Sequence, residues 1–266
     1  MLTWISFTLK DLDTISKKFW SAALQATLKS PFALKLSAFV DLSPKDTAIL
    51  VRFEKHKLRF GAGYEMGNHG DTNKAYILTA GWVISYKMMR DGSRQIIDIQ
   101  VPGDFLGLRS VLLRTSEYHF TPIVEIQAVE LLKSDLISIF EKAPRLGTAI
   151  LWAMSRDESM VVEHLVGLGR RKGEARIAHF LLEIGAKLLL VGMGDLSGYK
   201  CPLTQYHIAD ALGMSPVHVN RVLTKLRNSG LVTFRNGRVK FDNFNELVKM
   251  AEFDVSYLDH RGPLLK

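Results

Sequence analysis

The residues best placed for chemistry lie between positions 204 and 225, where capping, apolar and hydrogen-bonding side chains follow a regular order. Thr204 can cap a first helix, and Gly213 can adopt the left-handed conformation that a tight turn after that helix requires. Ser215 is a second N-cap, and Pro216 follows at the first helical position, where its missing N–H costs nothing. This spacing predicts a helix-turn-helix, whose second helix enters the major groove of DNA.

The second helix of the pair carries side chains suited to base recognition. Arg221 has a planar fork of donors that can bind guanine O6 and N7 together, whereas Val217 could make only apolar contact, for example with a thymine methyl group. The residues that we predict at the DNA interface are Thr204, Ser215, Pro216, Val217, His218, Asn220, Arg221, Lys225, Arg235 and Arg238.

A predicted β-hairpin follows the second helix. Residues 231–234 and 238–241 are rich in β-forming side chains, and Asn236-Gly237 between them favours a two-residue turn. The hairpin would form a wing, with Arg235 and Arg238 placed to contact phosphates. Ordinary solvated charge at a turn is the alternative.

The distribution of charge supports a nucleic-acid partner. The net charge is +8, and residues 169–240 contain 12 Lys and Arg against 4 Asp and Glu, which accounts for the whole excess; the remainder carries 23 of each. A localised basic excess is typical of a phosphate-binding surface, because neutralised phosphates release counterions. A solvated basic surface would give the same count.

Composition places the chain among globular proteins, with 47% apolar and 23% charged residues. Cys201 is the only cysteine, so neither an internal disulfide nor a multi-cysteine iron–sulfur site can form, and a cytoplasmic location fits. No basic residue precedes the first apolar run, and no run reaches the roughly 18 residues of a membrane span. We therefore expect no signal peptide and no membrane contact.

The elements that must position the motif can be read along the chain. Residues 1–30 form a helical extension of unassigned role, and 31–143 an antiparallel β-roll with runs at 76–78, 82–86, 96–99, 123–126 and 129–132. Asp91-Gly92 marks a hairpin within the roll. A long helix spans 144–168, a basic hinge 169–173, and the DNA-binding domain 169–266. The expected class is α+β.

The long helix has an apolar stripe at heptad spacing, formed by Leu151, Met154, Val161, Leu165 and Leu168, with Glu158 interrupting it. Such a stripe can be a dimer seam or a face packed on its own domain. Two heptads are few, so periodicity alone favours packing within the chain.

A roll, a long helix, a hinge and a winged helix-turn-helix in this order resemble the Crp–Fnr family of bacterial transcription regulators. The most specific segments are 209–215 and 219–223 in the motif, with Gly103-Asp104-Phe105-Leu106-Gly107 in the roll. The resemblance implies a cyclic-nucleotide-binding-like roll and a homodimer formed through the long helix. It also implies binding to a palindromic promoter site in double-stranded DNA, with RNA polymerase as a further partner. It changes the preferred interpretation of the apolar stripe to a dimer seam.

The chain also departs from the family pattern. Cyclic-AMP-binding members carry a glutamate where Leu108 stands, and an Arg-Ser pair where this chain has Tyr118-His119-Phe120. The resemblance therefore implies no tight cyclic-AMP binding, and the signal, if a small effector, is unidentified. Many members carry a glutamate at the position of Val217, so the base sequence of the family's DNA half-site cannot be assumed for this chain.

Two other function classes remain open, a cupin-like metal-dependent enzyme and a ligand-binding module that uses the roll. His56, His69, His119 and His164 are scattered without metal-ligand spacing, which disfavours the first. We predict no catalytic residues, no metal site and no cofactor, and we expect Cys201 to be a buried, inert thiol.

Overall fold

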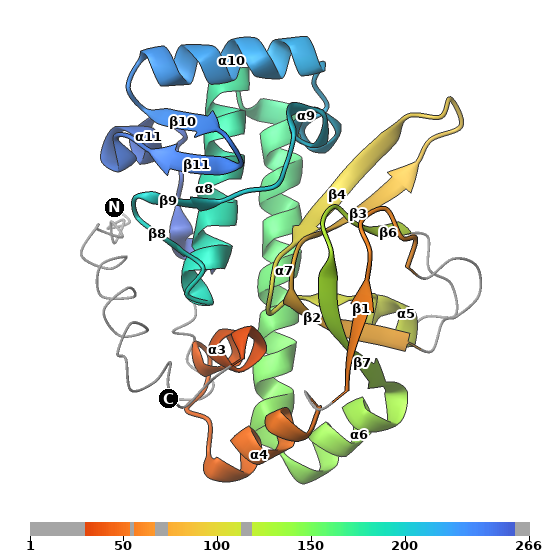
Figure 1. Ribbon diagram of the computed structural model, residues 1–266. Coiled ribbons are helices and arrows are strands. Elements are labelled where there is room, and N and C mark those ends of the chain that lie inside the picture. The colour runs from red at the N-terminus through yellow and green to blue at the C-terminus, as the bar shows by residue number, and fades with distance from the viewer. Residues whose placement is uncertain (1–29, 54–55, 67–73, 113–118, 259–266) are drawn as a thin grey trace.

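The computed structural model describes residues 30–53, 56–66, 74–112 and 119–258. Figure 1 shows a long helix through the middle of the molecule, with a β-roll on one side and a smaller unit of helices and short strands on the other. The α+β class and the order of these parts confirm the sequence-based prediction. The predicted helical extension over 1–30 lies outside the described residues, apart from Ser30.

Two helices precede the first strand, α3 (Pro31–Ser37) and α4 (Pro44–Phe53), so the β structure expected from residue 31 begins only at Lys57. Ser30 caps α3, since its hydroxyl accepts a hydrogen bond from the Ala33 N–H at 3.2 Å. Ser43 and Asp46 form a reciprocal cap at the start of α4, with N–H to side-chain distances of 2.9 and 3.2 Å. Local capping therefore marks the residue at which each helix begins.

The roll consists of two antiparallel sheets. One has the order β1 (Lys57–Phe60), β7 (Ile126–Leu132), β2 (Lys74–Ala80) and β5 (Phe105–Leu106); the other has β4 (Arg94–Gln100), β3 (Val83–Met88) and β6 (His119–Pro122). Between them lies an apolar interior that includes Met66, Leu78, Val83, Leu106, Ile126 and Ala128. Two further helices, α5 (Leu108–Leu112) and α6 (Lys133–Lys142), complete the roll.

The β3–β4 hairpin turns at Asp91-Gly92 as predicted. The Asp91 carboxylate accepts a hydrogen bond from the Ser93 N–H at 2.9 Å, and Gly92 has a φ of +83°. The strand expected over 123–126 was wrong, because β6 ends at Pro122 and β7 begins only at Ile126. Residues 123–125 connect the two sheets, and the Ile123 N–H donates a hydrogen bond to the Trp82 carbonyl at 3.0 Å.

The long helix α7 (Pro144–Arg170) has 27 residues, two more than predicted. One face is buried in its own chain and includes Leu146, Ala149, Ile150, Ala153 and Met160. Only Arg171 and Lys172 separate it from α8 (Gly173–Leu190). The expected hinge is therefore a very short connection.

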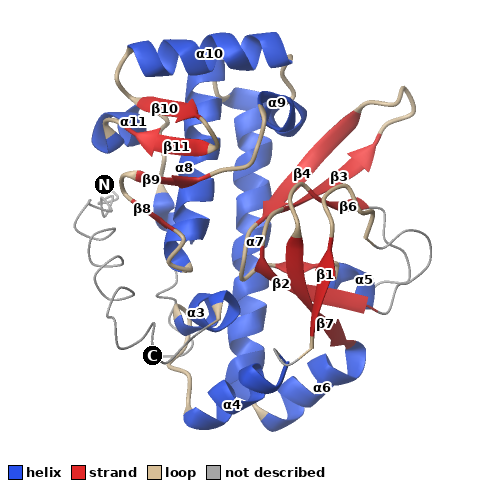
Figure 2. Cartoon of the chain, in the orientation of Figure 1, coloured by secondary structure: helices blue, strands red, loops and turns tan. Residues whose placement is uncertain are grey.

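The C-terminal unit surrounds α8 (Figure 2). Its helices are α9 (Gln205–Leu212), α10 (Pro216–Asn228), α11 (Phe244–Met250) and the 3₁₀ helix η1 (Val255–Leu258). Its sheet has the order β10 (Val232–Arg235), β11 (Arg238–Phe241), β9 (Gly198–Lys200) and β8 (Gly194–Asp195). One apolar cluster joins this unit to the roll, since Ile96 and Ile99 of β4 belong to the same core as Ile177 and Leu181 of α8. No helix among the described residues is long and apolar enough to cross a membrane.

Candidate DNA-binding surface

The helix-turn-helix forms as its capping residues predict. The Thr204 hydroxyl accepts a hydrogen bond from the His207 N–H at 3.4 Å, and the Ser215 hydroxyl accepts one from the His218 N–H at 3.2 Å. Gly213 ends α9 in the left-handed conformation with a φ of +61°. Pro216 then starts α10. Thr204 and Ser215, both in the predicted DNA-contacting set, thus use their hydroxyls to begin helices.

One face of α10 is buried and the opposite face is open. Val219, Val222 and Leu226 are at most 6% exposed and fix the helix on its own domain. Val217, Asn220 and Arg221 are exposed, and Thr224 is half-buried. Because residues three, four and seven apart share a helix face, these four side chains form one row, which we call the reading face.

His218 and Lys225 lie on a flank of α10, toward the start of α8. The Lys225 Nζ is 2.6 Å from a carboxylate oxygen of Glu174. The His218 Nε2 lies so close to Gly173 that a Cβ there would be 2.9 Å from it. Both side chains remain exposed, and each lies three or four positions from Arg221 of the reading face, so they border that face on the side of α8.

The wing is the predicted hairpin of β10 and β11. Asn236 and Gly237 both have positive φ, 51° and 67°, as a tight hairpin turn requires. Arg235 pairs directly with Arg238 across the ladder, and both are exposed. Two guanidinium groups thus stand beside the turn.

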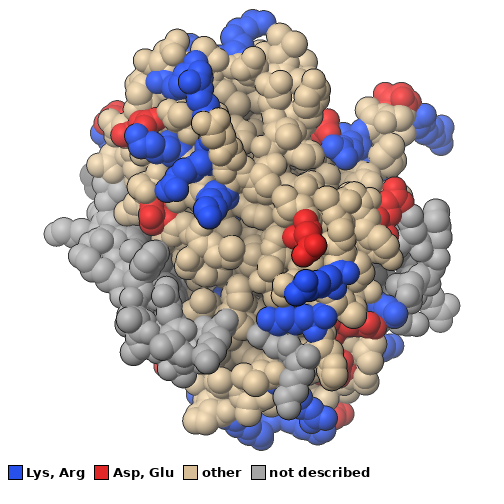
Figure 3. Space-filling model, viewed as in Figure 1, with Lys and Arg blue, Asp and Glu red and all other residues tan. Residues whose placement is uncertain are grey.

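A groove of about 410 Å³ separates α10 from the wing. Its lining includes Asn220 and Thr224 of the reading face, Gln205 at the start of α9, Arg227 of α10 and Arg235 of the wing. Figure 3 shows Lys and Arg side chains gathered over this part of the surface. Thr224 is a candidate that helix periodicity alone offers for the groove, whereas Gln205 and Arg227 line it beside the folded wing and have no such local signal.

The helix-turn-helix is attached to the rest of the chain through the end of α9. The Arg94 Nε of β4 lies 2.7 Å from an Asp210 carboxylate oxygen. The Ala211 carbonyl accepts hydrogen bonds from the Gln95 side-chain amide and from the His164 Nε2, each at 2.9 Å. Carbonyls at a helix C-terminus lack partners within the helix, so these donors also satisfy the end of α9.

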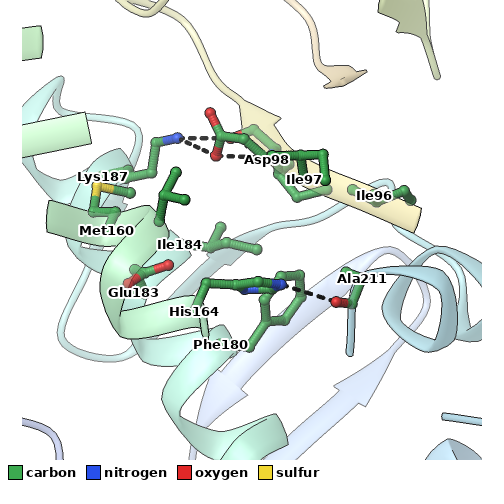
Figure 4. Close-up of a pocket in the computed structure, with 12 residues that line it drawn as sticks. Ile96, Ile97, Asp98, Met160, His164, Phe180, Glu183, Ile184, Lys187 and Ala211 are labelled. Atoms are coloured by element: carbon green, nitrogen blue, oxygen red, sulfur yellow. Dashed lines mark hydrogen bonds and ion pairs between the residues drawn. The ribbon is translucent and has the colours of Figure 1, made fainter. Parts of the chain in front are cut away.

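Figure 4 shows the junction where β4, α7, α8 and α9 meet. The Lys187 ammonium of α8 lies 3.3 Å from an Asp98 carboxylate oxygen and donates a hydrogen bond to the Ile99 carbonyl at 2.7 Å. The cavity beside it measures about 20 Å³, which is room for about one water molecule. Burial lowers the pKa of His164, which lines this cavity, so a neutral ring is favoured.

A second, partly buried polar contact lies within the C-terminal unit. Tyr257 of η1 donates a hydrogen bond to a Glu183 carboxylate oxygen at 2.8 Å. Burial raises the pKa of Glu183 to about 7, although the hydrogen bond from Tyr257 acts in the opposite direction. Glu183 is therefore a titrating group inside the DNA-binding unit.

Cys201 is a free thiol with no exposed surface, and burial raises its pKa to about 12. A thiol in this state is a poor nucleophile at neutral pH. Within the part of the chain that the structure describes, no three His, Cys, Asp or Glu side chains are grouped so that they could hold a metal ion.

Known proteins share both parts of this architecture. A Crp-like helix-turn-helix domain matches residues 175–250, and a cyclic nucleotide-binding domain matches residues 58–143. The nitrogen fixation regulation protein FixK of Bradyrhizobium diazoefficiens is 31% identical over 214 residues, which cover 79% of this chain and 88% of that protein. The transcriptional activatory protein AadR of Rhodopseudomonas palustris is 27% identical over 195 residues, covering 72% and 79%.

The structural comparison agrees with the sequence comparison. The structure of FixK2 from Bradyrhizobium japonicum superimposes with a TM-score of 0.63 at 25% identity, covering 73% of this chain and 96% of that one. A regulator of the CRP/FNR family from Thermus thermophilus has a TM-score of 0.58 at 18% identity and shares the fold. From its motifs, its fold and a relative that it matches over most of its length, the chain belongs to the Crp–Fnr family of DNA-binding transcription regulators.

Proposed function

We propose that this regulator acts as a homodimer that binds a palindromic promoter site, with one α10 in each of two successive major grooves. The observation that carries the proposal is the reading face, where Val217, Asn220 and Arg221 are exposed. The groove beside them is lined in part by Arg235 of the wing. Arg221 is the best candidate for a base contact, because its guanidinium can bind guanine O6 and N7 together. Arg235 and Arg238 would contact phosphates and set the register on the duplex.

The dimer is supported by the second face of α7. Leu151, Val161 and Leu165 are 52%, 46% and 68% exposed, which is unusual for large apolar side chains on a long helix. They stand at heptad spacing, and Met154 and Leu168 of the same stripe are half-buried. Pairing two such stripes would bury them and place the two recognition helices about 34 Å apart, one turn of the DNA helix.

The signal that controls the dimer is, in this proposal, not cyclic AMP. Leu108 is an apolar side chain, 6% exposed, at the position where the family's cyclic-AMP binders place a glutamate. The described interior of the roll is lined by apolar side chains such as Met66, Leu78 and Ile126. An apolar interior offers no cation to a cyclic phosphate. RNA polymerase is the further partner that we expect at the promoter.

The test is selection of bound duplexes from a random DNA pool by the purified full chain, without ligand, at about 150 mM salt. We expect an enriched palindrome whose half-sites lie one helical turn apart. Binding to all sequences with equal affinity would contradict the proposal, because it would reduce the basic surface to a non-specific phosphate contact.

A further inference from the structure

The reading face contains one side chain that cannot make a hydrogen bond. Val217 is 71% exposed on the first turn of α10 and belongs to none of the apolar clusters among the described residues. Valine is also a poorer helix former than alanine, lysine or glutamine, because its branched side chain loses rotamer freedom. Neither packing nor helix propensity accounts for an exposed valine here.

The neighbours of Val217 face the groove. Asn220 is three positions on and Arg221 four, so the three side chains are adjacent on one face. One helical turn rises about 5.4 Å, which is less than two base-pair steps of about 3.4 Å each. Val217 and Arg221 would therefore meet base pairs within about two steps of each other when α10 lies in the groove.

The chemistry available on α10 narrows what this face can recognise. Its 13 residues include no aspartate or glutamate, so the helix has no carboxylate to accept a hydrogen bond from cytosine N4. Asn220 suits adenine and Arg221 suits guanine. The one apolar group that bases present in the major groove is the C5-methyl of thymine, and Val217 is the large aliphatic side chain exposed on α10.

We propose that Val217 reads thymine, by packing its two methyl groups against the C5-methyl in the major groove. Each half-site would then require a T·A pair within about two steps of the G·C pair bound by Arg221. This inference rests on the proposed function, since it needs α10 to lie in the major groove. It adds a specificity determinant whose contact involves no hydrogen bond.

The experiment starts from the palindrome selected by the full chain. Each thymine of one half-site is replaced in turn by deoxyuridine, which removes the C5-methyl and leaves all hydrogen-bonding groups in place, and the dissociation constant is measured by fluorescence anisotropy. We expect one position at which the replacement weakens binding about fourfold, the usual effect of a single buried methyl-sized group. Replacement in both half-sites should weaken binding about fifteenfold.

The same duplexes are then tested with Val217→Ser, which lacks both methyl groups. This variant should bind the thymine and deoxyuridine duplexes equally. Val51→Ser is the matched control, because Val51 is 57% exposed on α4, remote from the reading face; it should keep the full fourfold difference. Val217→Glu should select cytosine in place of thymine at that position, because a carboxylate accepts a hydrogen bond from N4.

The outcomes separate the two proposals. If deoxyuridine at every thymine left binding to the palindrome unchanged, the thymine contact would be overturned. The proposal that a dimer binds the palindrome would still stand. A fourfold methyl effect that persists in Val217→Ser would assign the contact to another residue and overturn the role of Val217. A pool without any enriched sequence would overturn both, since no half-site would exist.

Discussion

The Nζ of Lys187 lies 2.9 Å from a carboxylate oxygen of Asp104, and both side chains are almost completely buried, at 4% and 6% exposure. Lys187 belongs to α8 of the DNA-binding unit, and Asp104 to the Gly-Asp-Phe segment of the roll. Burial opposes ionisation of Asp104, but the ammonium groups of Lys187 and Lys35 outweigh it and hold its pKa below the usual range. A charged contact therefore joins the two parts of the chain.

Lys35 extends this contact to the N-terminal helices. Its Nζ is 2.7 Å from the other carboxylate oxygen of Asp104, and the Val101 N–H donates to the first at 3.0 Å. Three segments that are distant in sequence thus meet at one carboxylate. Replacing a whole buried ion pair by apolar side chains is often neutral for stability. Our hypothesis is that this pair instead fixes the orientation of the DNA-binding unit on the roll.

Replacing Lys187 with methionine should destabilise the fold by about 3 kcal/mol, because removing one partner leaves charge buried without full compensation. The measurement is urea unfolding followed by tryptophan fluorescence. Lys249→Met is the matched control, since Lys249 pairs with Glu246 at the surface with 72% exposure and should change stability little. Equal unfolding midpoints for the two variants would show that the buried contact contributes no more to stability than the surface pair does.

Glu183 should make stability depend on pH in the neutral range. Its pKa is raised from the ordinary 4.5 to about 7 by burial, so the folded protein prefers the protonated side chain. The stabilisation is fully present below about pH 4.5 and is lost as the pH rises through about 7, on the order of 3 kcal/mol in total.

The measurement for Glu183 is the free energy of unfolding of wild type and Glu183→Gln between pH 5 and 8, taken as a difference at each pH. Glutamine keeps an acceptor for the Tyr257 hydroxyl and removes the titration. The difference should move in favour of the variant as the pH rises. A difference that stays constant with pH would mean that Glu183 remains in one protonation state throughout.

Arg221→Ala should weaken binding to the selected palindrome by about 1–3 kcal/mol and relax one base position in each half-site, because a bidentate guanine contact is lost. Arg235→Gln in the wing is the comparison. It should weaken binding to all sequences alike and reduce the slope of log K against log salt, as expected for a phosphate contact. If Arg221→Ala also weakened binding to all sequences alike, Arg221 would be a contact with the DNA phosphates and not with a base.

Leu165→Glu should dissociate the proposed dimer, since two carboxylates would meet in an apolar seam. We expect a change from dimer to monomer by light scattering, and at least about a tenfold loss of affinity for the palindrome. Val51→Glu introduces the same charge at an exposed valine outside α7 and should leave the dimer intact. If Leu165→Glu stays dimeric, the interface lies on another surface.

The sequence allowed the helix-turn-helix to be predicted almost residue by residue, because its geometry depends on local caps. Thr204, Gly213 and Ser215 act within three or four positions of themselves. The same signal occurs at Ser30-Pro31 and Ser43-Pro44, where α3 and α4 start within the span 31–143 that the β-like runs predict as a roll.

Other features could not be predicted from local patterns. The groove beside α10 is lined both by Arg227 of α10 and by Arg235 of the wing, so it depends on how the wing hairpin packs beside the helix. The meeting of Lys35, Asp104 and Lys187 joins positions up to 152 apart in sequence, and each residue alone resembles ordinary surface charge. Such contacts follow from the tertiary fold.

The length of α7, which only two residues separate from α8, has a mechanical consequence. At about 1.5 Å per residue, the 27 residues of α7 form a rigid arm about 40 Å long. In the proposed dimer, a change of about 5° in the angle between two such arms would move the far end by about 3.5 Å, which is about one base-pair step. Lever-arm geometry would thus convert a small rotation at the roll into a full register error on DNA, without any change inside the helix-turn-helix itself.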